Sequence, residues 1–244
     1  MKRVVLSFVV FSVGIILSAN ADVTLVQKVE GMGQDGNEMS IRIKGDKARI
    51  DSSPKLATII DSKSGEIVNL MNDRKTVMRI SAERMKAAAE MLGKFNASAK
   101  GGAEGKGKLT ATGKKEKVAG YDAEEYVYET PNFKATYWIA PSYPDGAAIL
   151  KQLQSLNSDV WQTNTLRLPD YRDFPGMPVK TVISAGDSTI TTTLVSVNQT
   201  PIDDAQFAVP KDFKEMKLPE MHMLPGGAEK GAESKPGPVA SPTP

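Results

Sequence analysis

Short runs in which apolar and polar residues alternate fill the first third of this chain, and they constrain its fold more than any other feature. Met39, Ile41 and Ile43, for example, are separated by single polar residues. A two-residue period places one face of a strand in a core and the other in water. Runs of this kind lie at residues 23–29, 39–44, 48–50, 56–61, 67–71 and 76–80. The turns between them are short and polar, which favours antiparallel hairpins, so the sequence predicts a meander of strands.

Two later segments have the three-to-four-residue period of a helix. Ser81 can cap the first helix, and Gly93 stands where that helix would end. Pro144 and Asp145 mark the start of the second helix. The apolar stripes are formed by Met85, Ala88 and Leu92 in the first helix and by Ile149, Leu150, Leu153 and Leu156 in the second.

Further strands complete the predicted fold, at residues 109–118, 124–129, 133–140, 179–185 and 188–197. Residues 166–178 contain three prolines and are interpreted as a loop. Helices grouped against one face of an antiparallel sheet make an α+β fold. We expect one domain over residues 22–220, followed by a disordered, Pro- and Gly-rich tail over residues 221–244.

The N-terminus has the form of a cleavable signal peptide. Lys2 and Arg3 precede an apolar run from Val4 to Leu17, and small residues follow, with Ala21 as the predicted cleavage residue. The apolar run is shorter than the roughly 20 residues that a membrane-spanning helix needs. We therefore expect residues 1–21 to be removed, leaving a bacterial periplasmic or secreted protein without a membrane span.

Charge and cysteine content narrow the classes of function. Loss of Lys2 and Arg3 lowers the 31 basic residues to 29, which equals the number of acidic residues. A balanced chain has no long-range field to attract nucleic acid or an anionic membrane, so we expect no nucleic-acid partner. The chain has no cysteine, which excludes thiol catalysis and cysteine-based zinc sites.

Motifs that would indicate catalysis are absent. The sequence has no G-x-S-x-G elbow, P-loop or G-x-G-x-x-G fingerprint. The single histidine, His222, lies near the C-terminus without a partner for a proton relay or a metal site. We predict no catalytic residue, no metal and no cofactor. A Ser–Lys dyad would not be visible from sequence spacing alone, so an enzyme stays open as a third alternative.

A basic, glycine-rich stretch interrupts the predicted elements. Residues 96–108 contain four glycines and no aromatic residue, so we interpret them as a mobile loop. Six lysines lie between Lys100 and Lys117. A solvated loop and strand edge explain them, and an anionic partner is the alternative. Six methionines, among them Met71 and Met78, suit either an ordinary core or an adaptable binding surface.

Three stretches together resemble the LolA/LolB-like periplasmic proteins. Leu56–Asp61 followed by Glu66–Leu70 resembles a central strand pair of that superfamily, and Ile41–Ile50 precedes it in the matching place. The closing stretch Val195–Pro210, with Phe207 shortly before Pro210, resembles the end of its domain. Lys117–Tyr126 looks more like an uncharacterised branch of the superfamily, a domain of unknown function.

The resemblance implies a strongly curved antiparallel sheet, an incomplete barrel, with two or three helices covering its open side. Its best-known members carry the acyl chains of lipoproteins between sheet and helices. On that analogy a ligand would contact a sheet wall of Met39, Ile41, Ile43 and Ile60 and a helical lid of Met85, Ala88, Leu92, Ile149 and Leu153.

The sequence therefore predicts a non-enzymatic, monomeric binding module for an apolar or acylated ligand, with lipid or a lipidated protein as partner. The alternative is a structural or interaction protein of the cell envelope that presents the Lys- and Gly-rich loop to a partner. Fold resemblance alone does not decide between these functions.

Overall fold

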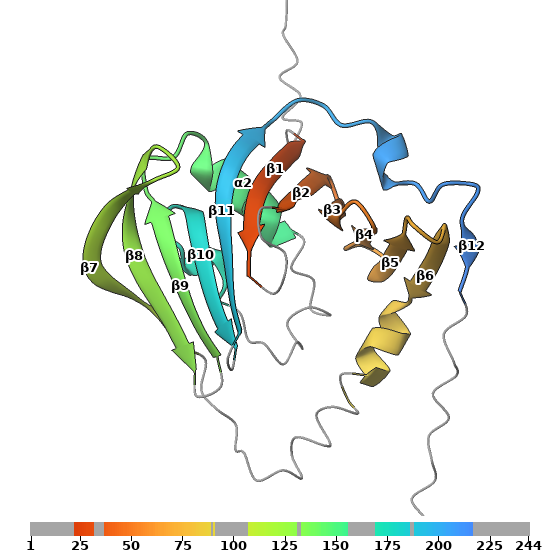
Figure 1. Ribbon diagram of the computed structural model, residues 1–244, viewed down its shortest axis with the longest axis horizontal. Coiled ribbons are helices and arrows are strands. Elements are labelled where there is room, and N and C mark those ends of the chain that lie inside the picture. Colours follow the sequence, from red (N-terminus) through yellow and green to blue (C-terminus); the bar gives the residue numbers. More distant parts are fainter. Residues whose placement is uncertain are drawn as a thin grey trace, which may run out of the picture.

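The strands of this protein form one open sheet. The computed structural model describes residues 22–31, 37–88, 90, 107–130, 133–155, 169–185 and 188–216. Twelve strands lie in the order β12-β6-β5-β4-β3-β2-β1-β11-β10-β9-β8-β7. Figure 1 shows the sheet curling from β7–β10 on one side to β2–β6 on the other without closing. The described architecture fits the expected incomplete barrel.

The first six strands make the predicted meander, in which each strand pairs antiparallel with the next. They are β1 (Val23–Glu30), β2 (Asn37–Lys44), β3 (Lys47–Ser53), β4 (Leu56–Asp61), β5 (Glu66–Met71) and β6 (Thr76–Ile80). Alternating sequence and short turns thus suffice to specify this half of the sheet.

The second half of the sheet joins the first in its middle, where β11 pairs antiparallel with β1. Its strands are β7 (Lys108–Val118), β8 (Tyr121–Thr130), β9 (Phe133–Ala140), β10 (Met177–Ala185) and β11 (Ser188–Asn198). The loop predicted at residues 166–178 was given too late an end, because Met177 and Pro178 already belong to β10. The register shifts between Pro178 and Lys180, as expected where a proline removes a ladder donor.

Two helices accompany the sheet in the described residues, which is the lower of the two numbers expected. Residues 82–88 are helical and follow β6. As predicted, Ser81 caps this helix, because its Oγ accepts a hydrogen bond from the Arg84 amide at 3.3 Å. Helix α2 (Gly146–Ser155) follows β9, and the short 3-10 turn η1 (Tyr171–Asp173) precedes β10.

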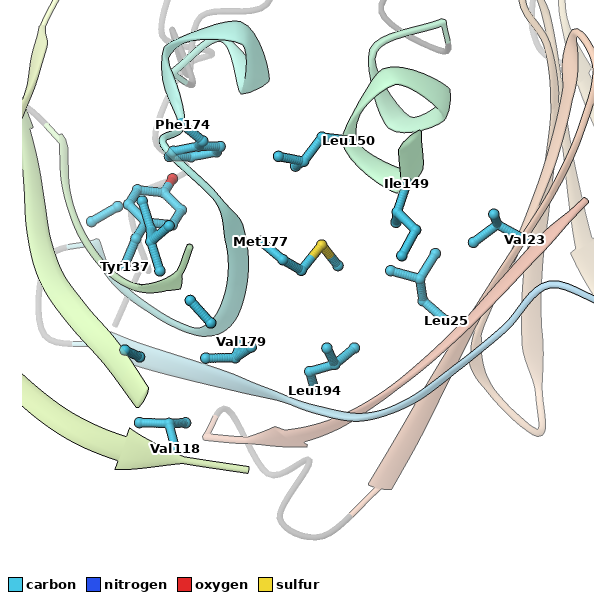
Figure 2. Packing of buried hydrophobic residues seen from close by; sticks show 14 of the residues in the cluster. Val23, Leu25, Val118, Tyr137, Ile149, Leu150, Phe174, Met177, Val179 and Leu194 are labelled. Carbon is cyan, nitrogen blue, oxygen red and sulfur yellow. The ribbon is translucent and has the colours of Figure 1, made fainter. Parts of the chain in front are cut away.

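The main core lies on the face of the sheet that α2 covers, which we name the inner face. Figure 2 shows Ile149 on α2 facing Val23 and Leu25 on β1, with Met177 reaching toward Ile149. These side chains are all 1 % exposed or less. Leu150 lies over Phe174, whose ring centroid is 5.0 Å from that of Tyr137. Such burial is worth about 1.5–3 kcal/mol for each large side chain.

A second core lies on the opposite, outer face of β4–β6. Ile59, Val68 and Leu70 contribute to it from the sheet. Residues 199–216, which we name the C-terminal strap, cover them with Ile202 and Phe207. The strap contains the 3-10 turn η2 (Asp204–Phe207) and ends in β12 (Lys214–Glu215), which pairs in parallel with β6. Figure 1 shows this segment passing from β11 to the β6 edge.

Several predictions lie outside the described residues. They concern the signal peptide with Ala21, the Gly- and Lys-rich loop up to residue 106, Leu92, Leu156, His222 and the tail over residues 221–244.

Candidate functional site

Cross-strand register arranges the inner face of β1–β6 in rows. The first row runs Val23, Ile43, Ala48, Ile60, Ile67 and Ile80, one residue from each strand in turn. Every member is apolar, and the first five are buried, with Ile60 and Ile67 each 6 % exposed. The two-residue period of each strand therefore produces one continuous apolar row across six strands.

The second and third rows on this face are less covered. The second runs Leu25, Ile41, Ile50, Thr58, Asn69 and Met78, and only Leu25 is fully buried. The third contains Gln27, Met39, Leu56, Met71 and Thr76. Leu56 is 41 % exposed, whereas Met39 and Met71 are partly buried. Burial thus decreases along the strands, from the first row to the third.

The incompletely buried apolar residues of these rows form a strip on β2–β6. We name as the inner-face strip Met39, Ile41, Ile50, Leu56, Met71, Met78 and Ile80. Five strands at a spacing of about 4.8 Å make this strip about 19 Å long across the sheet. Thr58 and Asn69 interrupt it in the second row and Thr76 in the third, and the Thr58 Oγ1 donates a hydrogen bond to the Asn69 Oδ1 at 2.9 Å. A mutually bonded pair leaves the strip predominantly apolar.

The predicted wall residues share this face but differ in burial. Ile43 and Ile60 are buried in the main core, and Ile41 packs against that core. Met39 belongs to the partly buried third row. Thus Met39 and Ile41 lie in the strip, while Ile43 and Ile60 form the packed base beside it.

The predicted lid residues lie on two separate helices. Ile149 is 1 % exposed in the main core, and Leu153 packs against the same core. Met85 and Ala88 are partly buried on the helix over residues 82–88. Figure 1 shows that helix below β6 and apart from α2, so these residues do not form one surface with Ile149.

Five residues of the strip were not predicted as site residues: Ile50, Leu56, Met71, Met78 and Ile80. The sequence indicated Met71 and Met78 only as members of a methionine-rich set. Their positions follow from the register of the hairpins, which pairs Leu56 with Met71 and Ile67 with Ile80. The signal in the sequence is parity on β3, β4 and β5, where Ile50, Leu56 and Met71 each lie an even number of positions from a buried inner-face residue of the same strand.

The outer face has two adjoining depressions beside the strap, with volumes of about 180 and 420 Å³. Lys47, Asp61 and Phe207 line both. The larger one is surrounded by three lysines and three aspartates, namely Lys44, Lys47, Lys63, Asp46, Asp61 and Asp204. Charges of both signs in equal number give this site no preference for an anion or a cation.

Ion pairs on the outer face hold the strap rather than a ligand. The Lys44 Nζ lies 2.8 Å from the Asp204 Oδ1 and also donates to the Ile202 carbonyl at 2.6 Å. The Lys44 hydrogen bond lowers the pKa of Asp204. The Arg49 Nη1 donates to the Gln206 carbonyl at 2.9 Å, while its Nε and Nη2 contact Asp51. Most polar groups of this face thus already have structural partners.

Ionisable groups buried near the main core are tyrosines. Burial is the largest cause that raises the pKa of Tyr137 and of Tyr171. Burial, with the neighbouring Tyr121, raises the pKa of Tyr143 to about 12. These hydroxyls stay protonated at neutral pH and therefore do not act as bases. Within the described ranges no group of His, Asp and Glu residues is placed to hold a metal ion.

Comparison with known proteins assigns the chain to a family. A family model described as "Domain of unknown function (DUF4412)" matches residues 26–213. The chain belongs to this family. Its matched region spans the sheet from β1 into the C-terminal strap, so the strap is part of the DUF4412 unit. A search of curated proteins finds no match to the sequence.

Solved structures resemble the DUF4412 chain at low identity. PNGF-II matches with 13 % identity and a TM-score of 0.39, covering 80 % of this chain and 31 % of its own, so the chain spans about a third of PNGF-II. Lipoprotein LppX of Mycobacterium tuberculosis matches with 11 % identity and a TM-score of 0.39 over 75 % of this chain and 88 % of its own. A LolA superfamily protein of Nitrosomonas europaea matches with 9 % identity and a TM-score of 0.28 over 77 % of this chain and 89 % of its own.

The superfamily named from the sequence is thus represented among these structures, and the matching family is one of unknown function, as predicted. In the described part of the chain, no helix has both the length and the apolar character to cross a membrane.

Proposed function

We propose that this protein is a non-enzymatic binding module that holds an apolar or acylated ligand on the inner-face strip. The observation that carries the proposal is the difference in burial across one apolar face. The half under α2 is packed with side chains that are 1 % exposed or less, such as Leu25, Met177 and Val179. On β2–β6 the same face retains the partly exposed strip, whose apolar surface gains free energy when a ligand covers it.

The chemistry of the strip suits a flexible apolar chain. Met39, Met71 and Met78 have unbranched, polarisable side chains that adapt to varied apolar partners. Ile41, Ile50 and Ile80 provide a stiffer surface between them. The outer-face depressions fit such a ligand less well, because charged side chains make up half of the lining residues of the smaller one and all but Phe207 of the larger one. A lipid, or the acyl group of a lipidated protein, has the required composition.

Titration with a fluorescent long-chain fatty acid tests this proposal. We expect saturable binding, and we expect Met78→Glu to weaken it by at least about tenfold, because a carboxylate must be desolvated under an apolar ligand. Met85→Glu tests whether the helix over residues 82–88 takes part. Val195→Glu is the matched control, since Val195 is 54 % exposed on β11 and lies outside the strip.

Binding that does not saturate, or that Met78→Glu and Val195→Glu weaken equally, would refute the proposal. Circular dichroism of each variant separates loss of the site from loss of the fold. We also propose that the module works after export to the periplasm or beyond. N-terminal sequencing of the exported protein should then find Asp22 first, and retention of Met1 would contradict this placement.

A further inference from the structure

The strand β7 forms one edge of the sheet among the described residues. Nine of its eleven residues are exposed, and only Val118 at its end is fully buried. It contains no proline. A strand edge presents backbone N–H and C=O groups that can pair with another strand. At the opposite edge, β12 already pairs with β6.

A bulge divides β7 into two straight parts. Between Ala111 and Lys115 the chain advances four residues while β8 advances two, from Tyr126 to Glu124. Gly113 adopts a φ of +81°, which a glycine accepts without strain. Thr112 caps the bulge, because its Oγ1 donates to the Glu125 carbonyl at 3.2 Å. The part after the bulge contains two lysines, Lys115 and Lys117, and between them Glu116, whose Oε1 lies 3.9 Å from the Lys180 Nζ.

The neighbouring strand β8 shows which chemistry complements this edge. Lys115 stands opposite Glu124, and Lys117 stands opposite Asp122. The Lys114 Nζ lies 3.4 Å from the Glu125 Oε1 and its side chain is 76 % exposed. Opposite charges on directly facing residues stabilise a strand pair, whereas like charges destabilise it. The strand that already pairs with β7 is therefore acidic.

The free side of β7 offers the same lysines to any strand that pairs there. An added strand would lie about 4.8 Å away, the same spacing as β8, and a lysine side chain is long enough to reach either neighbour. A second copy of β7 would bring lysine against lysine, and an apolar strand would desolvate ammonium groups without pairing them. An acidic strand would form hydrogen bonds with the backbone of the edge and would also pair with the charges of its lysines.

We propose that the free edge of β7 binds an acidic, extended segment of a partner protein, which adds to the sheet as a further strand. Lys114, Lys115 and Lys117 select the acidic segment, while backbone hydrogen bonds along the edge supply the strand geometry. The same lysines oppose pairing between two copies of the protein. This surface lies at the opposite end of the sheet from the inner-face strip and works independently of it.

Three labelled eight-residue peptides with neutral ends test the proposal against the full-length protein by fluorescence anisotropy. In the first, Glu alternates with Val; in the second, Lys replaces Glu; in the third, Pro replaces Val. The Glu–Val peptide should bind. The Lys–Val peptide should not bind, because of its charge. The Glu–Pro peptide should not bind either, because proline has no N–H to donate.

Variants of the protein assign the binding to β7. Lys115→Gln with Lys117→Gln should weaken the Glu–Val complex by about threefold to tenfold, given the usual worth of cross-strand charge pairs. Lys55→Gln with Lys63→Gln is the matched control, since both lysines are exposed in turns of the β3–β5 region. Hydrogen exchange should slow in residues 108–118 when the Glu–Val peptide is added.

Equal binding of the Glu–Val and Glu–Pro peptides would show charge attraction without strand pairing and would overturn the proposal. Absence of binding at millimolar peptide would overturn it as well. Because the peptide comparison uses unaltered protein, it stands even if the β7 variants fail to fold. Loss of fatty-acid binding with intact peptide binding would refute only the function proposed for the strip.

Discussion

Ile59 and Ile60 are adjacent in the sequence and belong to different cores. Ile60 belongs to the main core on the inner face, and Ile59 belongs to the outer core with the C-terminal strap. On β5, Ile67 lies on the inner face and Val68 in the outer core, and both are buried. Adjacent apolar residues in a strand indicate that both of its faces are covered. These doublets indicate the second core, which the expectation of one solvated face does not include.

At the residue scale, Tyr143 gives a prediction for the pH dependence of stability. Burial is the largest cause that raises its pKa, to about 12, and its ring centroid lies 4.5 Å from that of Tyr121. In the unfolded chain a tyrosine ionises near pH 10. Between about pH 10 and 12 the unfolded state therefore binds fewer protons than the folded state, and the free energy of unfolding falls as pH rises.

Tyr143→Phe removes this ionisation. We expect the variant to lose less stability than the wild type between about pH 10 and 12, measured by urea unfolding at several pH values. Below about pH 9 both states of the wild type keep the hydroxyl protonated, so the difference between the two proteins should be constant there. Parallel pH curves through the whole alkaline range would contradict the assigned cause.

At the element scale, the strands were predictable and the strap was not. The alternation around Ile41 and the turn at Gly45 fix β2 and β3 locally, and the structure confirms them. The strap has no periodicity, and side chains far away in sequence hold it: Asp22 and Lys44 bond to the backbone of Ile202. Long-range contacts of this kind leave no local pattern. The strip was predictable only in part. The alternation of residues shows which side chains lie on the inner face, but their exposure depends on which helix covers them.

Phe207→Ala tests how strongly the strap holds the sheet. Phe207 is 8 % exposed, and its ring packs on the outer core. Removal of a buried phenylalanine ring costs about 3–5 kcal/mol in the free energy of unfolding, and we expect a value near the lower end because the strap lies at the surface. Urea unfolding followed by circular dichroism measures it. Met216→Ala, at a residue 39 % exposed, should change stability by less than about 0.5 kcal/mol.

At the scale of the whole molecule, two cores share one sheet, and the shared strands couple them. The strand β4 contributes Ile60 to the main core and Ala57 and Ile59 to the outer core. Neither core can lose β4 without exposing apolar surface in the other. We therefore expect the described domain to unfold in one cooperative transition, in which different probes report the same midpoint.

Trp138 provides a probe of the half of the sheet that lies far from the strap. It belongs to β9, where the Lys180 Nζ lies 4.2 Å from the centre of its ring. Trp161, the second tryptophan of the chain, is replaced by Phe so that fluorescence reports on Trp138 alone.

In this background, Phe207→Ala should shift the urea midpoint of Trp138 fluorescence as far as that of circular dichroism. Ile149→Ala, which acts on the main core, should also shift both signals together. A fluorescence midpoint that stays in place while Phe207→Ala lowers the circular dichroism midpoint would mean that the two cores unfold separately, and that the strands they share do not couple them.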